Sequence, residues 1–172
     1  MKNKSKWILI VFILSFILSI IFSGISTSMA ESFNTIILAI IILVVIGIGI
    51  IFDMIGVAVL TCKESNLHAM ASKKMKGAKQ AIALTKNSTK VASVCNDVIG
   101  DICGIVSGSL GAALTLDIIG VIDVSSVIIT MVVTATISAL TVGFKAIFKD
   151  IAEKNSDSIV YTVGKILSIF KK

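Results

Sequence analysis

The side chains in this sequence with the clearest chemistry are three aspartates inside long apolar stretches, Asp53, Asp97 and Asp101. Asp97 and Asp101 are four residues apart, which places both on one face of an α-helix, and Asn96 precedes them. Carboxylate and amide oxygens are the ligands that hard divalent cations prefer. Ionisable residues in membrane spans usually face a bundle interior or a water-filled cavity. One hypothesis is therefore a cation held by Asp53, Asn96, Asp97 and Asp101.

A second interpretation places the same carboxylates at the boundary between membrane and water. Asp97 comes six residues after the start of its apolar stretch, and Asp53 lies within a few residues of the end of its own. Both could therefore reach interfacial water or stay protonated. The apolar stretches contain no lysine that would neutralise them. The residues alone leave the two interpretations open.

Small residues repeat at intervals of four in the same stretch, at Gly100, Gly104 and Gly108. Small residues at this spacing let two membrane helices approach closely. We expect helix packing along this stripe, either within the chain or between two copies of it. A row of hydroxyls recurs further along, and backbone or interhelical hydrogen bonding is its more ordinary role than cation binding. Its members are Thr130, Thr134, Ser138 and Thr141.

The composition excludes several classes of protein. Of the 172 residues 56% are hydrophobic and only 15% are charged, against roughly 25% charged in an ordinary globular chain. Disorder is excluded by the apolar content, and three cysteines are too few for a disulfide scaffold. All 16 basic residues are lysine and aromatics are scarce, which argues against a partner that is nucleic acid. An integral membrane protein remains.

Four apolar stretches predict the architecture. They cover residues 7–22, 35–60, 91–116 and 118–142. A helix needs about 20 apolar residues to cross a bilayer, and a spanning segment must satisfy its own backbone hydrogen bonds. The predicted fold class is an all-α polytopic membrane helical bundle with three core spans, preceded by an N-terminal span or a signal peptide.

The first stretch leaves two alternatives open. Its 16 residues fall between the usual lengths of a signal-peptide core and of a span. Ser28 and Ala30 match the small residues of a signal-peptidase site. Residues 1–30 are therefore either a segment cleaved after Ala30 or a retained first transmembrane helix, ahead of a transmembrane domain at 31–143.

The lysines predict the orientation, because cytoplasmic loops carry the excess of basic residues. They lie before the first stretch, between the second and third, and after the fourth. The connections at 23–34 and 117–123 contain none. We expect a multi-pass protein of the cell (inner, cytoplasmic) membrane with a cytoplasmic C-terminus.

Two cytoplasmic segments have an amphipathic pattern. Residues 63–88 predict juxtamembrane helices divided at Gly77, and residues 144–172 predict a tail of two membrane-surface helices. Their lysines suit anionic lipid headgroups, so the bilayer and its headgroups are expected partners. A surface helix without a specific ligand is the plainer alternative for 63–88.

Signatures of catalysis are missing from the sequence. It contains no phosphate-binding loop, dinucleotide fingerprint, nucleophile elbow or zinc-protease motif. His68 and the three cysteines do not have the spacing of a zinc site. We therefore expect no enzymatic activity.

Residues 35–170 resemble the transmembrane domain of the CorB/CorC/cyclin M family of magnesium transporters. The segments that carry the resemblance are Phe52–Thr61, Gly77-Ala78-Lys79 and Val94-Cys95-Asn96-Asp97. The resemblance implies transport of Mg²⁺ or Co²⁺. It also implies that Asn96 matches the magnesium-binding asparagine of that family and that Asp53 replaces a serine ligand.

The sequence also departs from that family. Gly56 stands where the family usually has glutamate, and Phe144-Lys145 stands where it has Gly-Glu. Asp97 and Asp101 could supply the missing carboxylates. We expect no gating through paired CBS domains, since none follows here.

Three hypotheses for the function result. The first is CorB/CorC-like transport or binding of a divalent cation, Mg²⁺ or Co²⁺, by a homodimer. The alternative is a non-transporting membrane scaffold or regulatory partner, which the lost glutamate positions favour. A holin-like pore former, which the basic tail would suit, comes third.

Overall fold

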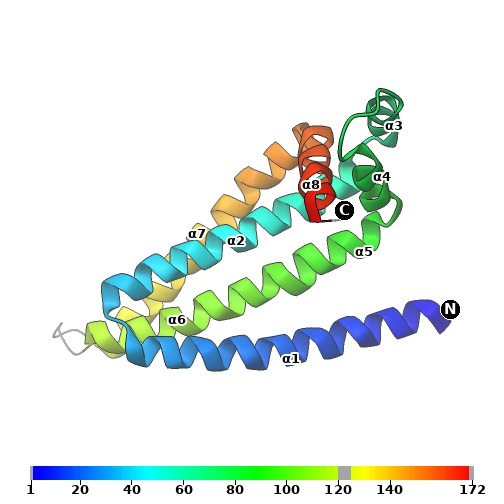
Figure 1. Cartoon of the computed structure of the whole chain (residues 1–172). Helices are drawn as coiled ribbons and strands as arrows, with labels where there is room; N and C mark the ends of the chain where they lie inside the picture. The colour runs from blue at the N-terminus through cyan, green and yellow to red at the C-terminus, as the bar shows by residue number, and fades with distance from the viewer. Residues whose placement is uncertain (1, 120–124, 171–172) are drawn as a thin grey trace. The chain divides into compact units, whose positions relative to one another are not determined.

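The computed structural model describes residues 2–119 and 125–170, and all regular structure in these ranges is helical. The helices are α1 (Lys2–Ser32), α2 (Thr35–Thr61), α3 (Glu64–Ser72), α4 (Ala78–Lys86), α5 (Ser88–Ala92), a π-helix η1 (Ser93–Gly100), α6 (Asp101–Ile119), α7 (Ser126–Lys154) and α8 (Ser156–Phe170) (Figure 1). Part of the predicted outer connection at 117–123, including Asp123, lies outside the described residues. Lys171 and Lys172 also lie outside them.

Within the described ranges, four helical segments are long and apolar enough to cross a membrane. They are Lys6–Met29 in α1, Thr35–Thr61, Ser88–Ile119 and Ser126–Lys154. The first three contain the apolar stretches 7–22, 35–60 and 91–116. The fourth prediction was placed too early, because residues 118–119 belong to α6 and α7 begins at Ser126 instead of Ile118. None of the four is interrupted by proline, because the chain has none. α1 continues without a break past the predicted cleavage site to Ser32. A helix here fits a signal peptide and a retained span equally, so cleavage after Ala30 stays a prediction.

The fourth of these helices is longer than the sequence predicts. We expected a span ending at Val142 and a separate surface helix from Phe144, but α7 continues without a break to Lys154. A glycine ends a helix mainly when it adopts the left-handed conformation. Gly143 has no positive φ, so the helix passes through it.

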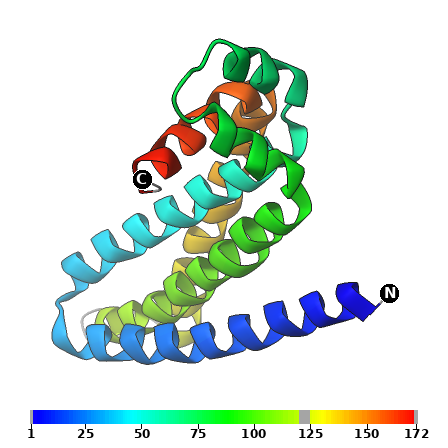
Figure 2. The same ribbon diagram turned by 45° about the vertical axis from the view of Figure 1, so that its right-hand side comes forward.

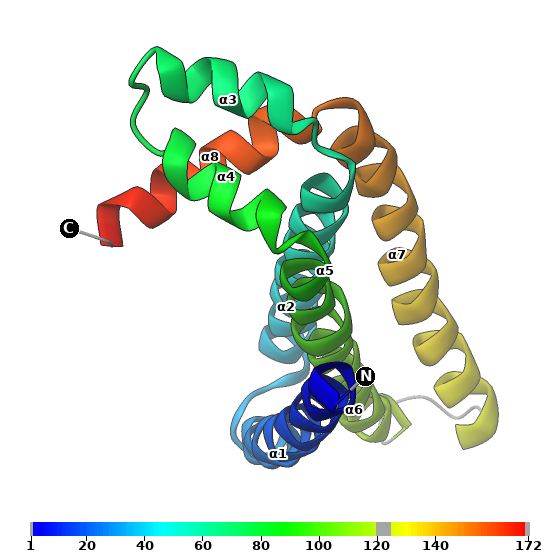
Figure 3. The same cartoon turned by 90° about the vertical axis from the view of Figure 1, so that its right-hand side faces the viewer.

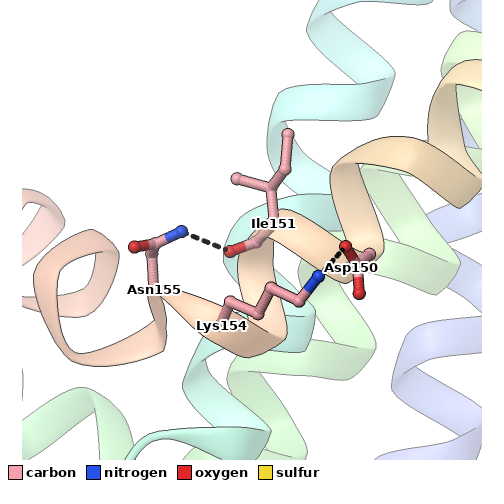
Figure 4. Close-up of polar contacts among 4 residues, drawn as sticks. All are labelled: Asp150, Ile151, Lys154 and Asn155. Atoms are coloured by element: carbon pink, nitrogen blue, oxygen red, sulfur yellow. Dashed lines mark hydrogen bonds and ion pairs between the residues drawn. The ribbon is translucent and has the colours of Figure 1, made fainter.

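The end of α7 is marked by local side-chain bonds (Figure 4). The Asn155 side-chain nitrogen donates to the carbonyl oxygen of Ile151 at 3.1 Å, satisfying one of the carbonyls that a helix leaves unpaired at its C-terminus. Lys154 and Asp150 form an ion pair of 2.6 Å one turn apart. The predicted tail therefore provides one separate helix, α8, instead of two.

The chain divides into two compact units. Unit 1 comprises residues 1–50 and 98–144, and unit 2 comprises residues 51–97 and 145–172.

Unit 1 is built around α6. α1 lies alongside α6 (Figure 2), and the first part of α2 runs antiparallel to it. The Thr35 hydroxyl donates to Asp117 at 3.2 Å at one end, and a Cβ atom on Gly49 would lie 2.9 Å from Cβ of Cys103 at the other. Buried residues recur at intervals of four on both helices, which is the ridge spacing of packed helices. They are Leu38, Ile42, Ile46 and Ile50 on α2, and Ile102, Val106, Leu110 and Leu114 on α6.

Unit 2 packs α3, α4 and α8 against one another (Figure 3). Gly77, with φ of 91°, turns the chain between α3 and α4, so the predicted division of this segment at Gly77 is confirmed. A Cβ atom on Gly164 would lie 2.6 Å from the carbonyl oxygen of Gly77, so this close crossing of α4 and α8 requires glycine. The core of the unit is formed by Val57, Ala58, Val59, Leu67, Ala81, Ala152 and Val160.

Candidate cation site

Asn96 lies against the backbone of α2 in unit 2. A Cβ atom built on Gly56 would overlap the amide oxygen of Asn96, so the side chain occupies the space that glycine leaves. That oxygen, Oδ1, is buried and has no hydrogen-bond partner. Buried polar atoms are nearly always paired, because an unsatisfied one costs about 1–3 kcal/mol. In the described part of the chain it is the only buried side-chain nitrogen or oxygen in this condition.

The backbone that carries Asn96 is π-helical. η1 covers eight residues, Ser93–Gly100, and π-helical turns are rare and often found at functional sites. The sequence predicts ordinary α-helix here, and no residue type in the stretch indicates a π-helix. Because Asp97 lies within η1 and Asp101 begins α6, the argument that both share one face by α-helical spacing does not hold across this segment.

Asp53 is paired with a lysine. Nζ of Lys145 lies 3.8 Å from Oδ1 of Asp53, and the two side chains are 28% and 20% exposed. We expected no lysine to neutralise the intramembrane aspartates, and this expectation is wrong for Asp53. The reason is the extension of α7 beyond Val142, which places Lys145 on a helix in unit 2 where its long stem reaches the carboxylate.

The remaining two predicted ligands are solvent-exposed. Asp97 belongs to unit 2 with Asp53 and Asn96, whereas Asp101 belongs to unit 1. Within the described ranges, no three histidine, cysteine, aspartate or glutamate side chains gather closely enough to hold a metal ion. What the structure brings to one face of α2 is Asp53 with Lys145, and, three residues further along, Gly56 with Asn96.

The glycine stripe packs only in part. The carbonyl oxygen of Gly100 lies 3.8 Å from the Cβ position of Gly49 on α2, but Gly104 and Gly108 have no heavy atom within 4 Å of theirs. Both instead line a hollow of about 360 Å³ between α6 and α7, together with Thr134 and other residues of α7. Gly104 and Gly108 therefore form no close helix seam within unit 1.

The hydroxyl row on α7 bonds to its own helix. Thr130, Thr134 and Thr141 each donate to the carbonyl oxygen four residues earlier, at 2.9, 2.7 and 2.8 Å. This is the ordinary role expected for these residues from the sequence.

Asp157 carries a polar cluster that the sequence analysis missed. Its carboxylate accepts hydrogen bonds from the Cys62 thiol at 3.1 Å, from the Lys63 backbone N–H at 3.1 Å and from the Asn66 side chain. The bond from Asn66 holds the pKa of Asp157 below its ordinary value. Burial, with the neighbouring carboxylate, raises the pKa of Cys62 to about 12. The cluster joins the end of α2 to the start of α8.

The only sequence signal for this cluster is weak. An acidic residue in the first turn of a helix is a common stabilising feature, and Asp157 is the second residue of α8. Its three partners lie more than 90 residues away. Their approach is a consequence of the tertiary fold.

Comparisons with models of protein families, with curated proteins and with solved structures give no match.

Proposed function

We propose that the chain is a multi-pass protein of the cell membrane that binds and transports a divalent cation, Mg²⁺ or Co²⁺, in the manner of the CorB/CorC transporters it resembles. The observation that carries this proposal is the buried amide oxygen of Asn96, which lacks a donor. A cation is one of the few partners that would satisfy such an oxygen without adding a protein donor.

The chain offers this cation few protein ligands, and a site with few protein ligands is common for Mg²⁺. Mg²⁺ usually keeps several of its waters and binds through one or two protein oxygens. Here those would be the Asn96 amide and the Asp53 carboxylate, which face the same side of α2. Asp97, which is exposed in the same unit, would act through bridging water, and Asp101 is left out because it belongs to unit 1.

Binding of Mg²⁺ to the purified full-length protein in vesicles tests the site. The variant Asn96→Ala should bind Mg²⁺ about tenfold more weakly, a change that corresponds to about 1.4 kcal/mol. Asn87→Ala is the matched control, because it removes an amide whose nitrogen bonds to its own helix, at the carbonyl oxygen of Ala83. Equal affinity of both variants and the wild type would remove Asn96 from the site.

A second candidate function is a non-transporting membrane scaffold or regulatory partner. The Asp53–Lys145 pair favours it, because the carboxylate already has a counter-ion. Gly56 favours it too, since a glutamate there would collide with Asn96 as it lies now. Under this function, purified protein in vesicles moves no Mg²⁺ yet co-purifies with another membrane protein.

We propose that the protein is a homodimer, because two glycines of α6 have no heavy atom close to their Cβ positions. Gly104 and Gly108 line the hollow between α6 and α7, and side chains of a second copy would fill it. The mass of the protein in detergent, measured by sedimentation, tests this proposal. Replacing both glycines with leucine should then give the monomer, while an unchanged mass would place the contact elsewhere.

A further inference from the structure

α8 has an apolar side that nothing in the described part of unit 2 covers. With 15 residues it is shorter than the roughly 20 needed to cross a bilayer. One side of it, with Val160 and Gly164, is buried against α4. Other large apolar side chains are open: Ile166 is 50% exposed, Ile169 71% and Phe170 84%.

The exposed residues Ile166 and Phe170 continue a stripe along α8 that begins at the partly buried Ile159 and Val163. Ile159, Val163, Ile166 and Phe170 follow one another at spacings of four, three and four, which places them on one side of the helix. The first three of them line a hollow of about 310 Å³. Its opposite wall is the α2 segment of the same unit, with Ile51, Met54 and Ile55.

The α2 wall indicates what covers this stripe. α2 is long and apolar enough to cross a membrane, and Ile51 on it is half exposed. If α2 crosses the membrane, lipid acyl chains cover Ile51. The apolar surface is continuous from Ile51 through the hollow to α8, so the same acyl chains reach the stripe.

The charge of unit 2 matches one face of such a membrane. Residues 51–97 and 145–170 contain eleven lysines against six acidic residues. The Gly77 backbone packs on Gly164 and Lys165, so the lysines of the preceding turn, Lys73, Lys74 and Lys76, lie at the same end of the unit as Lys165. A basic border beside an apolar stripe is the pattern of a helix that lies in an anionic leaflet.

We propose that α8 is an interfacial membrane helix. The stripe from Ile159 to Phe170 contacts acyl chains, one of which fills the hollow beside α2, and the neighbouring lysines lie among the headgroups of anionic phospholipids. This inference rests on the membrane part of the proposed function and is independent of the cation.

Single tryptophan probes in the full-length protein test the inference. Trp7 is the only native tryptophan and is first replaced by phenylalanine. Phe170→Trp then reports whether the stripe contacts acyl chains. Because Phe170 is aromatic and 84% exposed, this substitution should change the stability of the fold little. Lys165→Trp, on another side of α8, is the matched control. Ile51→Trp reports whether α2 is in the bilayer. Each variant is placed in vesicles of phosphatidylcholine and phosphatidylglycerol with brominated acyl chains, which quench tryptophan on contact.

We expect the Phe170→Trp variant to lose nearly as much fluorescence as the Ile51→Trp variant, and the Lys165→Trp variant to lose much less. Quenching at position 51 without quenching at position 170 overturns the interfacial helix and leaves the membrane assignment standing, with a protein partner then needed on the stripe. Equal quenching at positions 170 and 165 also overturns it. Quenching at neither position 51 nor position 170 overturns both the inference and the membrane assignment.

Discussion

Nζ of Lys145 lies 3.8 Å from Oδ1 of Asp53, so that the C-terminal third of α7 carries a counter-ion to the one aspartate inside α2. The pair gives Asp53 two opposed roles in the proposed function. It is an oxygen ligand for a cation, and it is already occupied by an ammonium group that a cation must displace.

Removal of this competitor should therefore strengthen cation binding. Partly exposed ion pairs contribute about 0.2–1 kcal/mol, so Lys145→Gln should tighten Mg²⁺ binding by up to about fivefold. Binding titrations of the protein in vesicles measure this. Lys149→Gln, an exposed lysine on the same helix, should have no effect. Unchanged or weaker binding in Lys145→Gln would mean that Asp53 is not a ligand.

The contact between Gly56 and Asn96 predicts a steric effect. Gly56→Ala places a methyl group where the Asn96 amide lies, and overpacking of this kind costs about 1–3 kcal/mol. We expect a lower thermal midpoint and weaker Mg²⁺ binding. Gly143→Ala, which has open space around it, should leave both nearly unchanged.

A double variant shows whether the two residues act through each other. Truncation of Asn96 makes room for the new methyl group, so Gly56→Ala with Asn96→Ala should be more stable than the sum of the single changes predicts. Strict additivity of the thermal shifts would contradict the contact.

The Asp157 cluster predicts a loss of stability in acid. Its pKa in the folded protein is lowered, so its contribution is present above the ordinary aspartate pKa and is lost as pH falls through the lower, folded-state pKa. Hydrogen bonds to charged groups contribute about 1.5–3 kcal/mol, and partial exposure reduces this to about 1 kcal/mol. Thermal midpoints in detergent between pH 7 and pH 3 measure it. Asp157→Asn should be less stable at pH 7, and its difference from the wild type should shrink as the pH falls below the ordinary aspartate pKa.

The same cluster predicts that the Cys62 thiol reacts slowly with alkylating reagents. With a pKa raised to about 12, very little thiolate forms at pH 8, and the thiolate is the reactive species. Maleimide labelling should be much slower at Cys62 than at a cysteine introduced by Ser65→Cys, an exposed position on α3. Comparable rates at the two sites would show that Cys62 does not donate to Asp157.

Helical structure was predictable from local pattern wherever the pattern was long. The apolar stretches contain no proline, and a backbone in an apolar medium must pair with itself, so the first three stretches lie in helices. The fourth was placed eight residues too early, because hydropathy alone did not separate the end of α6 from the start of α7 at Ser126. Gly77 was readable as a break because glycine adopts a left-handed turn at little cost. The end of α7 could not be predicted from hydropathy, because hydropathy falls after Val142. The helix nevertheless continues to Lys154, since polar residues maintain the same backbone hydrogen bonds.

The sequence by itself determined the class of structure and the residues that could bind a cation, since residue type and spacing depend only on neighbours along the chain. The tertiary structure decided the rest. Asn96 lies in a π-helical turn against Gly56, Asp53 is paired with Lys145, and Asp157 joins α2 to α8. Each of these pairings depends on contacts between residues at least 40 positions apart. Such contacts are determined by how helices pack in space, and this packing cannot be deduced from the pattern of neighbouring residues along one sequence.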